Sequence, residues 1–349
     1  MKEIESNIVN IPPKITPEKE AQKPYITDSQ KRLNDKLNRA LGDKILEKLK
    51  DTTTEDIFRN EDGKVWLKKS GQKEYELLQT MSDGMAEAIL RTVASSLEYD
   101  ITPERPFLDG VLPTDGSRIH GNIPPASIAP TFTIRRKSSI LIGLQDYVDQ
   151  GTMTVEQKDI LEEAIITHEN IFVVGSTGSG KTTLVNGLMD AAYRLTPNDR
   201  FVILEDTPEV QCNAINKTFL KTTEERELSD LVKESLRMRP DRIIVGEVRG
   251  AEALNLLEIW NTGHRGGIAT AHAETATAEG AMKRLEMLIA SSGIKFDATF
   301  VRNLIASTVN IIVCIDQTTD GRKITSVSEV REYDEKRAKH NFYRLDTGE

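Results

Sequence analysis

The sequence predicts an α/β protein in which a smaller α+β N-terminal domain precedes a second domain built on a mainly parallel, doubly wound sheet. The chain has 349 residues, of which 38% are hydrophobic, and this is enough for two cores of ordinary size. From about residue 154 onward, short apolar runs alternate with helical segments, which is typical of parallel strands joined by helices. One such run, Asn170–Val174, leads into a glycine-rich loop and then the helix-prone segment Thr183–Tyr193.

The first domain is expected to cover residues 28–137, after a disordered tail at 1–27 in which four prolines stand among charged and polar residues. Asp28 is expected to cap a helix in which leucine or isoleucine recurs every four residues. Another helix is expected from about Met85 to Leu97. Thr131–Arg136 alternates between polar and apolar residues, which favours a strand.

A hairpin is expected between the two helices of this domain. The runs Asp56–Phe58 and Val65–Leu67 flank the turn sequence Asn60–Gly63, with Gly63 at the left-handed position. Helices and antiparallel strands together make this domain α+β.

Residues 138–153 are expected to link the domains and to contain a short helix at Ile140–Val148. The second domain, residues 154–349, opens with a capping box at Thr154–Gln157, which starts a helix ending near Thr167. Ligands bind such sheets beyond the carboxyl ends of the strands. Further strands are expected at Phe201–Leu204, Arg242–Val245, Gly267–Thr270, Asn310–Val313 and within Val327–Leu345.

The glycine-rich loop has the spacing G-x-x-x-x-G-K-T at a strand-to-helix junction, which predicts a phosphate-binding loop rather than a simple turn. Its backbone N–H groups and the helix N-terminus form an anion cradle. Lys181 is expected to reach the β- and γ-phosphates of ATP, and the Thr182 hydroxyl to bind Mg²⁺. The residues expected to hold the nucleotide are Gly175, Ser176, Thr177, Gly178, Ser179, Gly180, Lys181, Thr182 and Thr183.

Carboxylates follow two of the expected strands. Glu247 comes after Arg242–Val245 and is expected to be the general base, or to hold Mg²⁺ through a water molecule. Glu205 stands in the same relation to the run before it, and the two carboxylates are expected to divide metal positioning and water activation. The alternatives are an ordinary surface glutamate at 247 and a helix N-cap at Asp206, ahead of Thr207.

Basic residues lie close to these carboxylates in the sequence. His272 ends the run at Gly267–Thr270 and is a candidate to sense the γ-phosphate, with His264 a weaker one. Phosphoryl transfer needs added positive charge in its transition state. The candidate arginines are Arg237, Arg239, Arg242 and Arg249 beside Glu247, and Arg118, Arg135 and Arg136 in the first domain.

The composition and charge of the chain argue against several other classes of protein. The net charge of −9 argues against a protein that binds nucleic acid by broad phosphate neutralisation. The two cysteines, Cys212 and Cys314, lack metal-site spacing, which argues against a zinc module and fits a reducing cytosol. The charged residues at the N-terminus are not expected to form a secretory signal. The apolar segment Asn303–Ile315 is shorter than the roughly 20 residues that cross a bilayer, so membrane association is expected to be peripheral.

The ordered set of motifs resembles the hexameric ATPases of the secretion superfamily, in their type IV secretion and conjugal-transfer branch, and looks closest to the TrbB-like conjugation ATPases. The likeness covers roughly residues 100–330. The segments that carry it, in chain order, are the phosphate loop, Leu204–Glu209, Met238–Gly250 and Gly263–His272. In that family they are the Walker A, Asp box, Walker B and His box elements.

This resemblance implies a RecA-like P-loop NTPase domain and a homohexamer with nucleotide between the two domains, at the cytoplasmic face of the inner membrane. It implies that Arg118 and Arg135 reach the nucleotide. The implied function is an ATPase that powers type IV secretion, conjugative DNA transfer and pilus biogenesis, with other secretion ATPases and inner-membrane components as partners. Two alternatives remain: a type II secretion or type IV pilus ATPase, and a nucleotide-gated docking scaffold.

Overall fold

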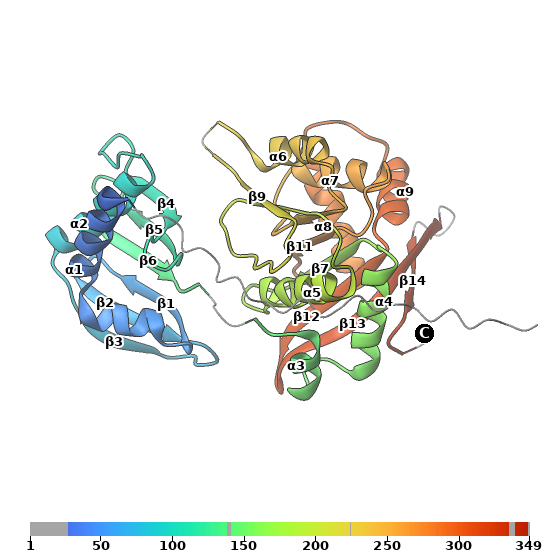
Figure 1. Cartoon of the computed structure of the whole chain (residues 1–349), viewed down its shortest axis with the longest axis horizontal. Helices are drawn as coiled ribbons and strands as arrows, with labels where there is room; N and C mark the ends of the chain where they lie inside the picture. Colours follow the sequence, from blue (N-terminus) through green and yellow to red (C-terminus); the bar gives the residue numbers. More distant parts are fainter. Residues whose placement is uncertain (1–26, 138–140, 224, 335–338, 348–349) are drawn as a thin grey trace, which may run out of the picture.

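The computed structural model describes residues 27–137, 141–223, 225–334 and 339–347 (Figure 1). Its strands fall into two separate sheets, one formed before residue 137 and the other after residue 170. The predicted tail lies outside the described residues except for Thr27, as do the first residues of the predicted linker. In Figure 1 the two sheets belong to two bodies that lie side by side.

The first body is an antiparallel sheet covered by two helices on one face (Figure 1). Among the described residues its six strands follow the order β3-β2-β1-β6-β5-β4. A core of leucine, isoleucine and valine side chains from both helices and the sheet fills the space between them. The elements are α1 (Asp28–Lys50), β1 (Thr54–Arg59), β2 (Lys64–Lys69), β3 (Tyr75–Thr80), α2 (Asp83–Ser96), β4 (Phe107–Val111), β5 (Arg118–Asn122) and β6 (Thr131–Arg135).

The first helix is capped by Thr27, so the prediction of an Asp28 cap is wrong by one residue. The Thr27 hydroxyl accepts from the backbone N–H of Gln30, whose side chain accepts from the N–H of Thr27, which completes a capping box. The predicted hairpin is confirmed, with Gly63 at φ 78°. Helix α2 begins two residues before the predicted Met85 because Ser82 caps it.

The second body is a mixed sheet with helices on both faces. Among the described residues its eight strands follow the order β14-β13-β12-β7-β11-β10-β8-β9, and β12 through β9 are parallel. The elements are α3 (Leu144–Asp149), α4 (Val155–Ile166), β7 (Ile171–Gly175), α5 (Lys181–Leu195), β8 (Phe201–Glu205), β9 (Lys217–Lys221), α6 (Leu228–Ser235), the 3₁₀ helix η1 (Leu236–Met238), β10 (Arg242–Val245), α7 (Glu252–Asn261), β11 (Ile268–His272), α8 (Ala278–Ala290), α9 (Ala298–Thr308), β12 (Ile311–Thr318), β13 (Gly321–Asp334) and β14 (Lys339–Arg344).

Two apolar cores lie on opposite faces of this sheet. Helices α3, α4 and α5 pack on one face, and α6 to α9 pack on the other. The central strands β7, β8 and β10 are buried along their whole length, which explains their continuous apolar sequences. The predicted α/β fold with a mainly parallel sheet is confirmed. The predicted helix after the capping box at Thr154 is also confirmed, whereas the linker helix begins at Leu144 rather than Ile140.

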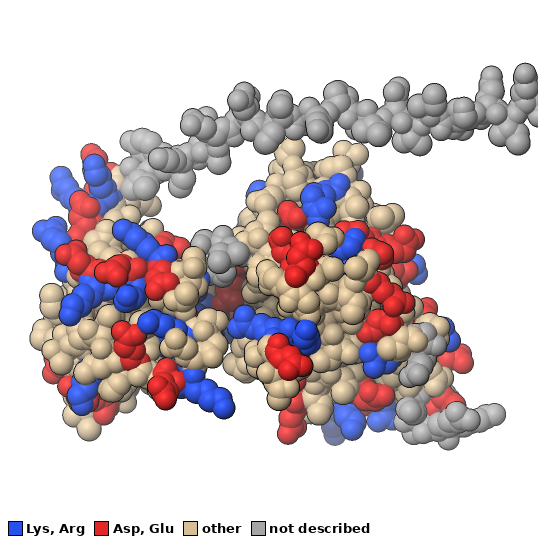
Figure 2. Space-filling view, turned by 90° about the horizontal axis from the view of Figure 1, so that it is seen from below, with Lys and Arg blue, Asp and Glu red and all other residues tan. Residues whose placement is uncertain are grey.

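The parallel order brings the ends of β12, β7, β11, β10 and β8 to one edge of the sheet. The phosphate loop and the candidates Glu205, Glu247 and His272 lie at this edge, at or just after a strand end. None of the described helices is both long and apolar enough to span a membrane. Acidic and basic side chains are interspersed on the face that Figure 2 shows.

Candidate nucleotide site

The loop between β7 and α5 has the backbone that a phosphate cradle requires. Gly178 and Gly180 adopt φ values of 75° and 99°, which residues other than glycine rarely adopt. A Cβ on Gly175 would lie 2.1 Å from the carbonyl oxygen of Ile315, so the loop passes too close to β12 for any other residue there. No side chain of the described residues caps α5, so its first N–H groups are left for an anion.

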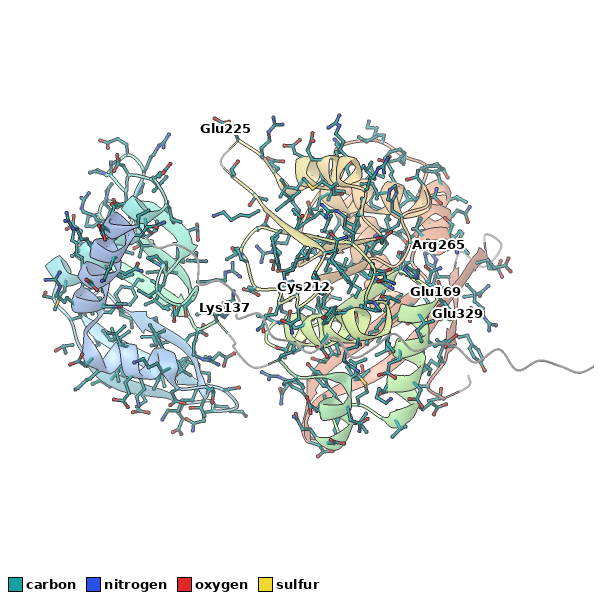
Figure 3. The ribbon with its side chains drawn as sticks, in the orientation of Figure 1. Lys137, Glu169, Cys212, Glu225, Arg265 and Glu329 are labelled. Atoms are coloured by element: carbon teal, nitrogen blue, oxygen red, sulfur yellow. The ribbon has the colours of Figure 1, made fainter. Side chains whose placement is uncertain are left out.

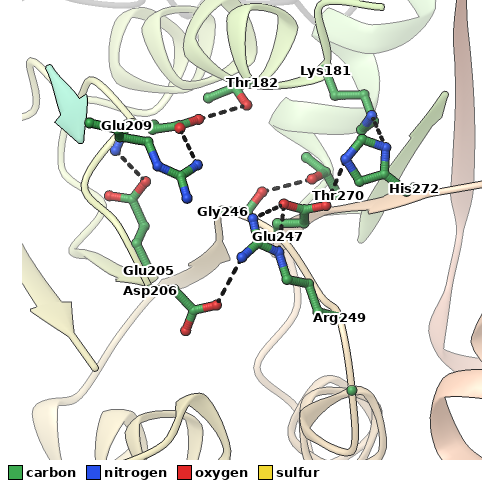
Figure 4. Close-up of polar contacts among 12 residues, drawn as sticks. Lys181, Thr182, Glu205, Asp206, Glu209, Gly246, Glu247, Arg249, Thr270 and His272 are labelled. Atoms are coloured by element: carbon green, nitrogen blue, oxygen red, sulfur yellow. Dashed lines mark hydrogen bonds and ion pairs between the residues drawn. The ribbon is translucent and has the colours of Figure 1, made fainter. Parts of the chain in front are cut away.

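Lys181 is the first residue of α5 and is only 6% exposed. Its Nζ donates to the carbonyl oxygens of Gly175 at 3.0 Å and Ser176 at 2.8 Å, and lies 3.0 Å from Nδ1 of His272 (Figure 4). Burial lowers the pKa of Lys181 to about 8, while the Glu247 carboxylate opposes that fall. The lysine is therefore a poorly solvated cation, which a phosphate group would stabilise.

These contacts fix the protonation of His272. An ammonium group only donates hydrogen bonds, so Nδ1 of His272 accepts and the ring proton is on Nε2. The Nε2 atom lies 3.0 Å from Oε1 of Glu247. Burial and the nearby Lys181 lower the pKa of His272, which keeps the ring neutral. The histidine thus connects the phosphate-loop lysine to the carboxylate after β10.

Arg249 holds the other oxygen of Glu247. Its Nε and Nη2 lie 2.9 and 2.5 Å from Oε2, and its Nη1 lies 3.6 Å from Asp206 (Figure 4). The Thr270 hydroxyl donates to the carbonyl of Gly246 and fixes the backbone just before the glutamate. Both carboxylate oxygens of Glu247 are therefore oriented by neighbouring side chains.

A pocket of about 30 Å³ lies between these groups and the first domain. Glu209, which the sequence analysis did not single out, is central to it. Its Oε1 accepts from Arg118 at 2.7 Å and its Oε2 lies 3.4 Å from the Thr182 hydroxyl. The sequence feature that could have identified it is its position in the segment Leu204–Glu209, which also contains Glu205, directly after a proline. The lining residues are Arg118, Thr182, Glu205, Asp206, Thr207, Glu209, Gly246, Glu247 and Arg249.

Glu205 lies in the wall of this pocket and is only 5% exposed. Its Oε1 accepts from the backbone N–H groups of Glu209 and Val210, both at 2.8 Å. The segment after it forms no helix, so the alternative of a helix N-cap at Asp206 is wrong. Burial raises the pKa of Glu205 to about 7, although the two N–H donors oppose the rise.

We expect Glu205→Gln to increase thermal stability relative to the wild type as pH rises. The folded pKa of Glu205 is about 7, above the 4.5 of an exposed glutamate, so the folded state retains a proton that the unfolded state loses. The wild type loses this stabilisation between pH 4.5 and 7, whereas glutamine does not titrate. Melting curves from pH 5 to 8 measure this difference in Tm. A constant difference would contradict the raised pKa.

The other arginines of the first domain and the two cysteines make contacts of different kinds. Arg135 pairs with Asp56 at 2.9 Å and lies beside Arg118 on the neighbouring strand. Both arginines line a larger cavity of about 1310 Å³ between the two bodies, where Figure 2 shows a hollow. Arg136 donates to backbone carbonyls of the first domain. Both cysteines are buried and free, with Cys212 labelled in Figure 3.

Of the four arginines predicted to cluster around Glu247, only Arg249 contacts it. Arg242 is buried at the start of β10 and pairs with Asp199 at 2.6 Å, while Arg237 pairs with Glu234. Arg239 is in a left-handed conformation at the end of η1. His264 does not line the small pocket.

The donor set fits a nucleotide with a hard divalent cation. Ser179 Oγ is buried and, among the described residues, has no hydrogen-bond partner, although it lies within the loop. The Ser176 hydroxyl donates to Asp316 at 2.5 Å, whereas Thr177 and Gly178 are exposed and Thr183 is half-buried.

The described residues contain no cluster of three or more His, Cys, Asp or Glu side chains arranged to hold a metal. Mg²⁺ usually keeps waters and phosphate oxygens with one or two protein ligands, which the Thr182 hydroxyl and nearby carboxylates could supply.

Comparisons with known proteins show which family this chain resembles. The family model described as "Type II/IV secretion system protein" matches residues 39–341. The chain is 42% identical over 305 residues to a probable conjugal transfer protein TrbB of Sinorhizobium fredii, covering 87% of this chain and 92% of the relative. It is 39% identical over 318 residues to the conjugal transfer protein TrbB of Rhizobium radiobacter, covering 91% and 95%. The X-ray structure of the Legionella pneumophila ATPase DotB has a similar fold, with a TM-score of 0.56 and 21% identity over 83% of this chain and 80% of that one.

Proposed function

The chain belongs to the type II/IV secretion system protein family and is an ATPase of its type IV secretion and conjugal-transfer branch, and we propose that Mg-ATP hydrolysis drives a conformational change in it that powers conjugative DNA transfer and pilus biogenesis. The observation that supports the proposal most is the chain of contacts from Lys181 through His272 to Glu247 and Arg249. It connects the phosphate loop directly to the carboxylate that we propose activates water.

In this proposal Lys181 binds the β- and γ-phosphates and leaves the carbonyl oxygens that now hold it. The backbone of the loop from Gly175 to Thr183 holds the rest of the phosphate chain. Mg²⁺, when bound through the Thr182 hydroxyl and through water to Glu247, would neutralise charge on the phosphates. His272 loses its contact with Lys181 at the same time, so its Nδ1 becomes free to accept a proton, and the protonated Nδ1 would then donate to the γ-phosphate.

Glu247 is the proposed general base. It takes a proton from water as the water oxygen bonds to the γ-phosphorus and the bond to the β–γ bridging oxygen breaks. The Nε2–H of neutral His272 and the guanidinium of Arg249 orient its two oxygens before substrate arrives. Glu205 holds the backbone of Glu209 by accepting its N–H. We include Glu205 among the proposed catalytic residues.

The first domain takes part through Arg118, which contacts Glu209 and through it approaches Thr182. A change at the phosphates would thus reach the first domain, and we propose that Arg118 and Arg135 contact the nucleotide there. The proposed working form is a homohexamer of subunits with a first domain at 28–137, a linker at 138–153 and an ATPase domain at 154–349. It would lie at the cytoplasmic face of the inner membrane, with other secretion ATPases and membrane components as partners.

Lys181→Met is expected to abolish nucleotide binding. The side chain loses its positive charge at the centre of the anion cradle, which the backbone alone does not replace. Thermal melting with and without ATP measures this: at about 100 times the Kd, ATP stabilises a binding-competent protein by about 2.7 kcal/mol. We expect a rise in Tm for the wild type and none for the variant. An equal rise in both would contradict the assigned role of Lys181.

Phosphate release from Mg-ATP as a function of protein concentration tests the function. Specific activity that climbs steeply with concentration supports a site completed by assembly of several subunits. ATP binding without turnover at any concentration, with or without added lipid, would instead favour a nucleotide-gated docking scaffold. A complementation assay distinguishes the proposed function from that of a type II secretion or pilus ATPase. The chain is expressed in a strain that lacks its own conjugation ATPase. If the enzyme is well expressed and active but does not restore conjugation, the result would count against the proposal.

A further inference from the structure

The two ends of a bound nucleotide must lie on different sides of the phosphate loop. Glu247 follows β10 and His272 ends β11, and both strands lie on one side of β7 in the sheet. Strands β12 and β13 lie on the other side of β7. A triphosphate whose γ-phosphate faces Glu247 therefore places its nucleoside toward the hairpin formed by β12 and β13. This argument rests on the proposed function of the loop.

One cation of that hairpin lies directly against the loop. Arg322 stands opposite Gln317 in the β12–β13 ladder. A Cβ built on Gly180 would lie 3.5 Å from Cδ and 3.8 Å from Nε of Arg322. The same built Cβ would lie 3.7 Å from Cδ1 of the buried Ile315. The arginine stem thus passes over the first turn of α5, beside an apolar side chain.

The guanidinium of Arg322 is free to bind a ligand. The side chain is exposed, and no carboxylate of the described residues pairs with it. Its charge partly opposes the rise that burial causes in the pKa of Tyr147, a residue of α3 that packs against α5. The nearest carboxylate on β12, Asp316, already accepts from the Ser176 hydroxyl and the N–H of Gln317. A planar cation is therefore left at the point where the nucleoside leaves the loop.

We propose that Arg322 binds the nucleobase of the bound nucleotide by stacking its guanidinium on the ring. Guanidinium groups stack on aromatic faces, and such stacking reads no hydrogen-bond pattern. The contact is made equally in the ground state and the transition state, because the base is remote from the reacting phosphorus. Arg322 is thus an affinity residue for nucleosides that accepts both purines, and it has no part in the chemical step.

The test compares ATP, GTP and inorganic tripolyphosphate binding to wild type, Arg322→Ala and Arg322→Lys, by calorimetry or by competition with a fluorescent nucleotide. We expect both variants to raise the Kd for ATP and GTP about tenfold, because lysine lacks the planar group, and to leave kcat unchanged. The Kd for tripolyphosphate, which has no base, is expected to stay the same. Arg331→Ala is the matched control, because Arg331 lies on the same strand and stacks on Tyr343 far from the loop.

Three outcomes would overturn the inference. If tripolyphosphate affinity falls as much as ATP affinity and lysine restores both, Arg322 contacts phosphate instead of the base. If neither variant changes any Kd, the nucleoside lies elsewhere while the loop still binds phosphate. A wild type that binds neither ATP nor tripolyphosphate would overturn the proposed function together with this inference.

Discussion

Glu247→Gln is expected to lower kcat for ATP hydrolysis by about 10²–10⁴-fold, the contribution typical of a general base. An amide has nearly the same shape as the carboxylate and can still accept from the Nε2–H of His272, but it cannot take a proton from water. ATP affinity is expected to stay within about threefold of the wild type, because the phosphates are held by the loop. Loss of kcat with a nearly unchanged KM is the signature of an interaction made only in the transition state.

Steady-state phosphate release and a separate ATP-binding measurement together test this expectation. Glu258→Gln, an exposed residue of α7, is the matched control for the substitution. Full activity in Glu247→Gln, alongside an inactive Lys181→Met, would exclude Glu247 as the base. The same assay on Glu205→Gln, Asp206→Asn and Glu209→Gln would then identify which of the other three carboxylates in the pocket acts instead.

The site could be predicted from the sequence where its residues stand at the ends of parallel strands. Lys181 and Glu247 follow β7 and β10, His272 ends β11, and a parallel sheet brings such ends to one edge. The direct contact between Lys181 and His272 could not be predicted, because the two residues are 91 positions apart and their approach depends on the conformation of a single side chain. The tautomer of His272 could not be predicted either, because it depends on the Lys181 ammonium group donating to Nδ1.

The incorrect arginine cluster has a geometric explanation. Arg242 begins β10 and Glu247 follows its end, and three steps of about 3.3 Å along a strand separate Arg242 from Val245 by about 10 Å. Arg242 therefore lies toward the opposite edge of the sheet, where Asp199 neutralises it. Glu209 was missed for a different reason. Its position depends on the irregular path after β8, which Glu205 fixes by accepting two backbone N–H groups.

The second large effect is expected at Arg118, through which the first domain contacts the pocket. We expect Arg118→Ala to lower kcat by about 10³-fold, the lower end of what an arginine contributes to phosphoryl transfer. Arg118→Lys should restore little of this, because lysine lacks the planar fork that contacts two oxygens at once. Arg105→Ala is the control, since Arg105 lines the larger cavity but not the small pocket.

Arg118 could instead act only by holding Glu209, and a double-mutant cycle separates the two roles. If Arg118 contacts the phosphates, its removal costs a similar factor in kcat whether Glu209 is present or replaced by alanine. If it only positions Glu209, Arg118→Ala costs nothing further once Glu209→Ala has been made, because the two residues then act as one unit. We expect the first result. Glu209 neutralises Arg118, and a phosphate group competing for the same guanidinium would release Glu209 toward Thr182, which is how hydrolysis at the loop would move the first domain.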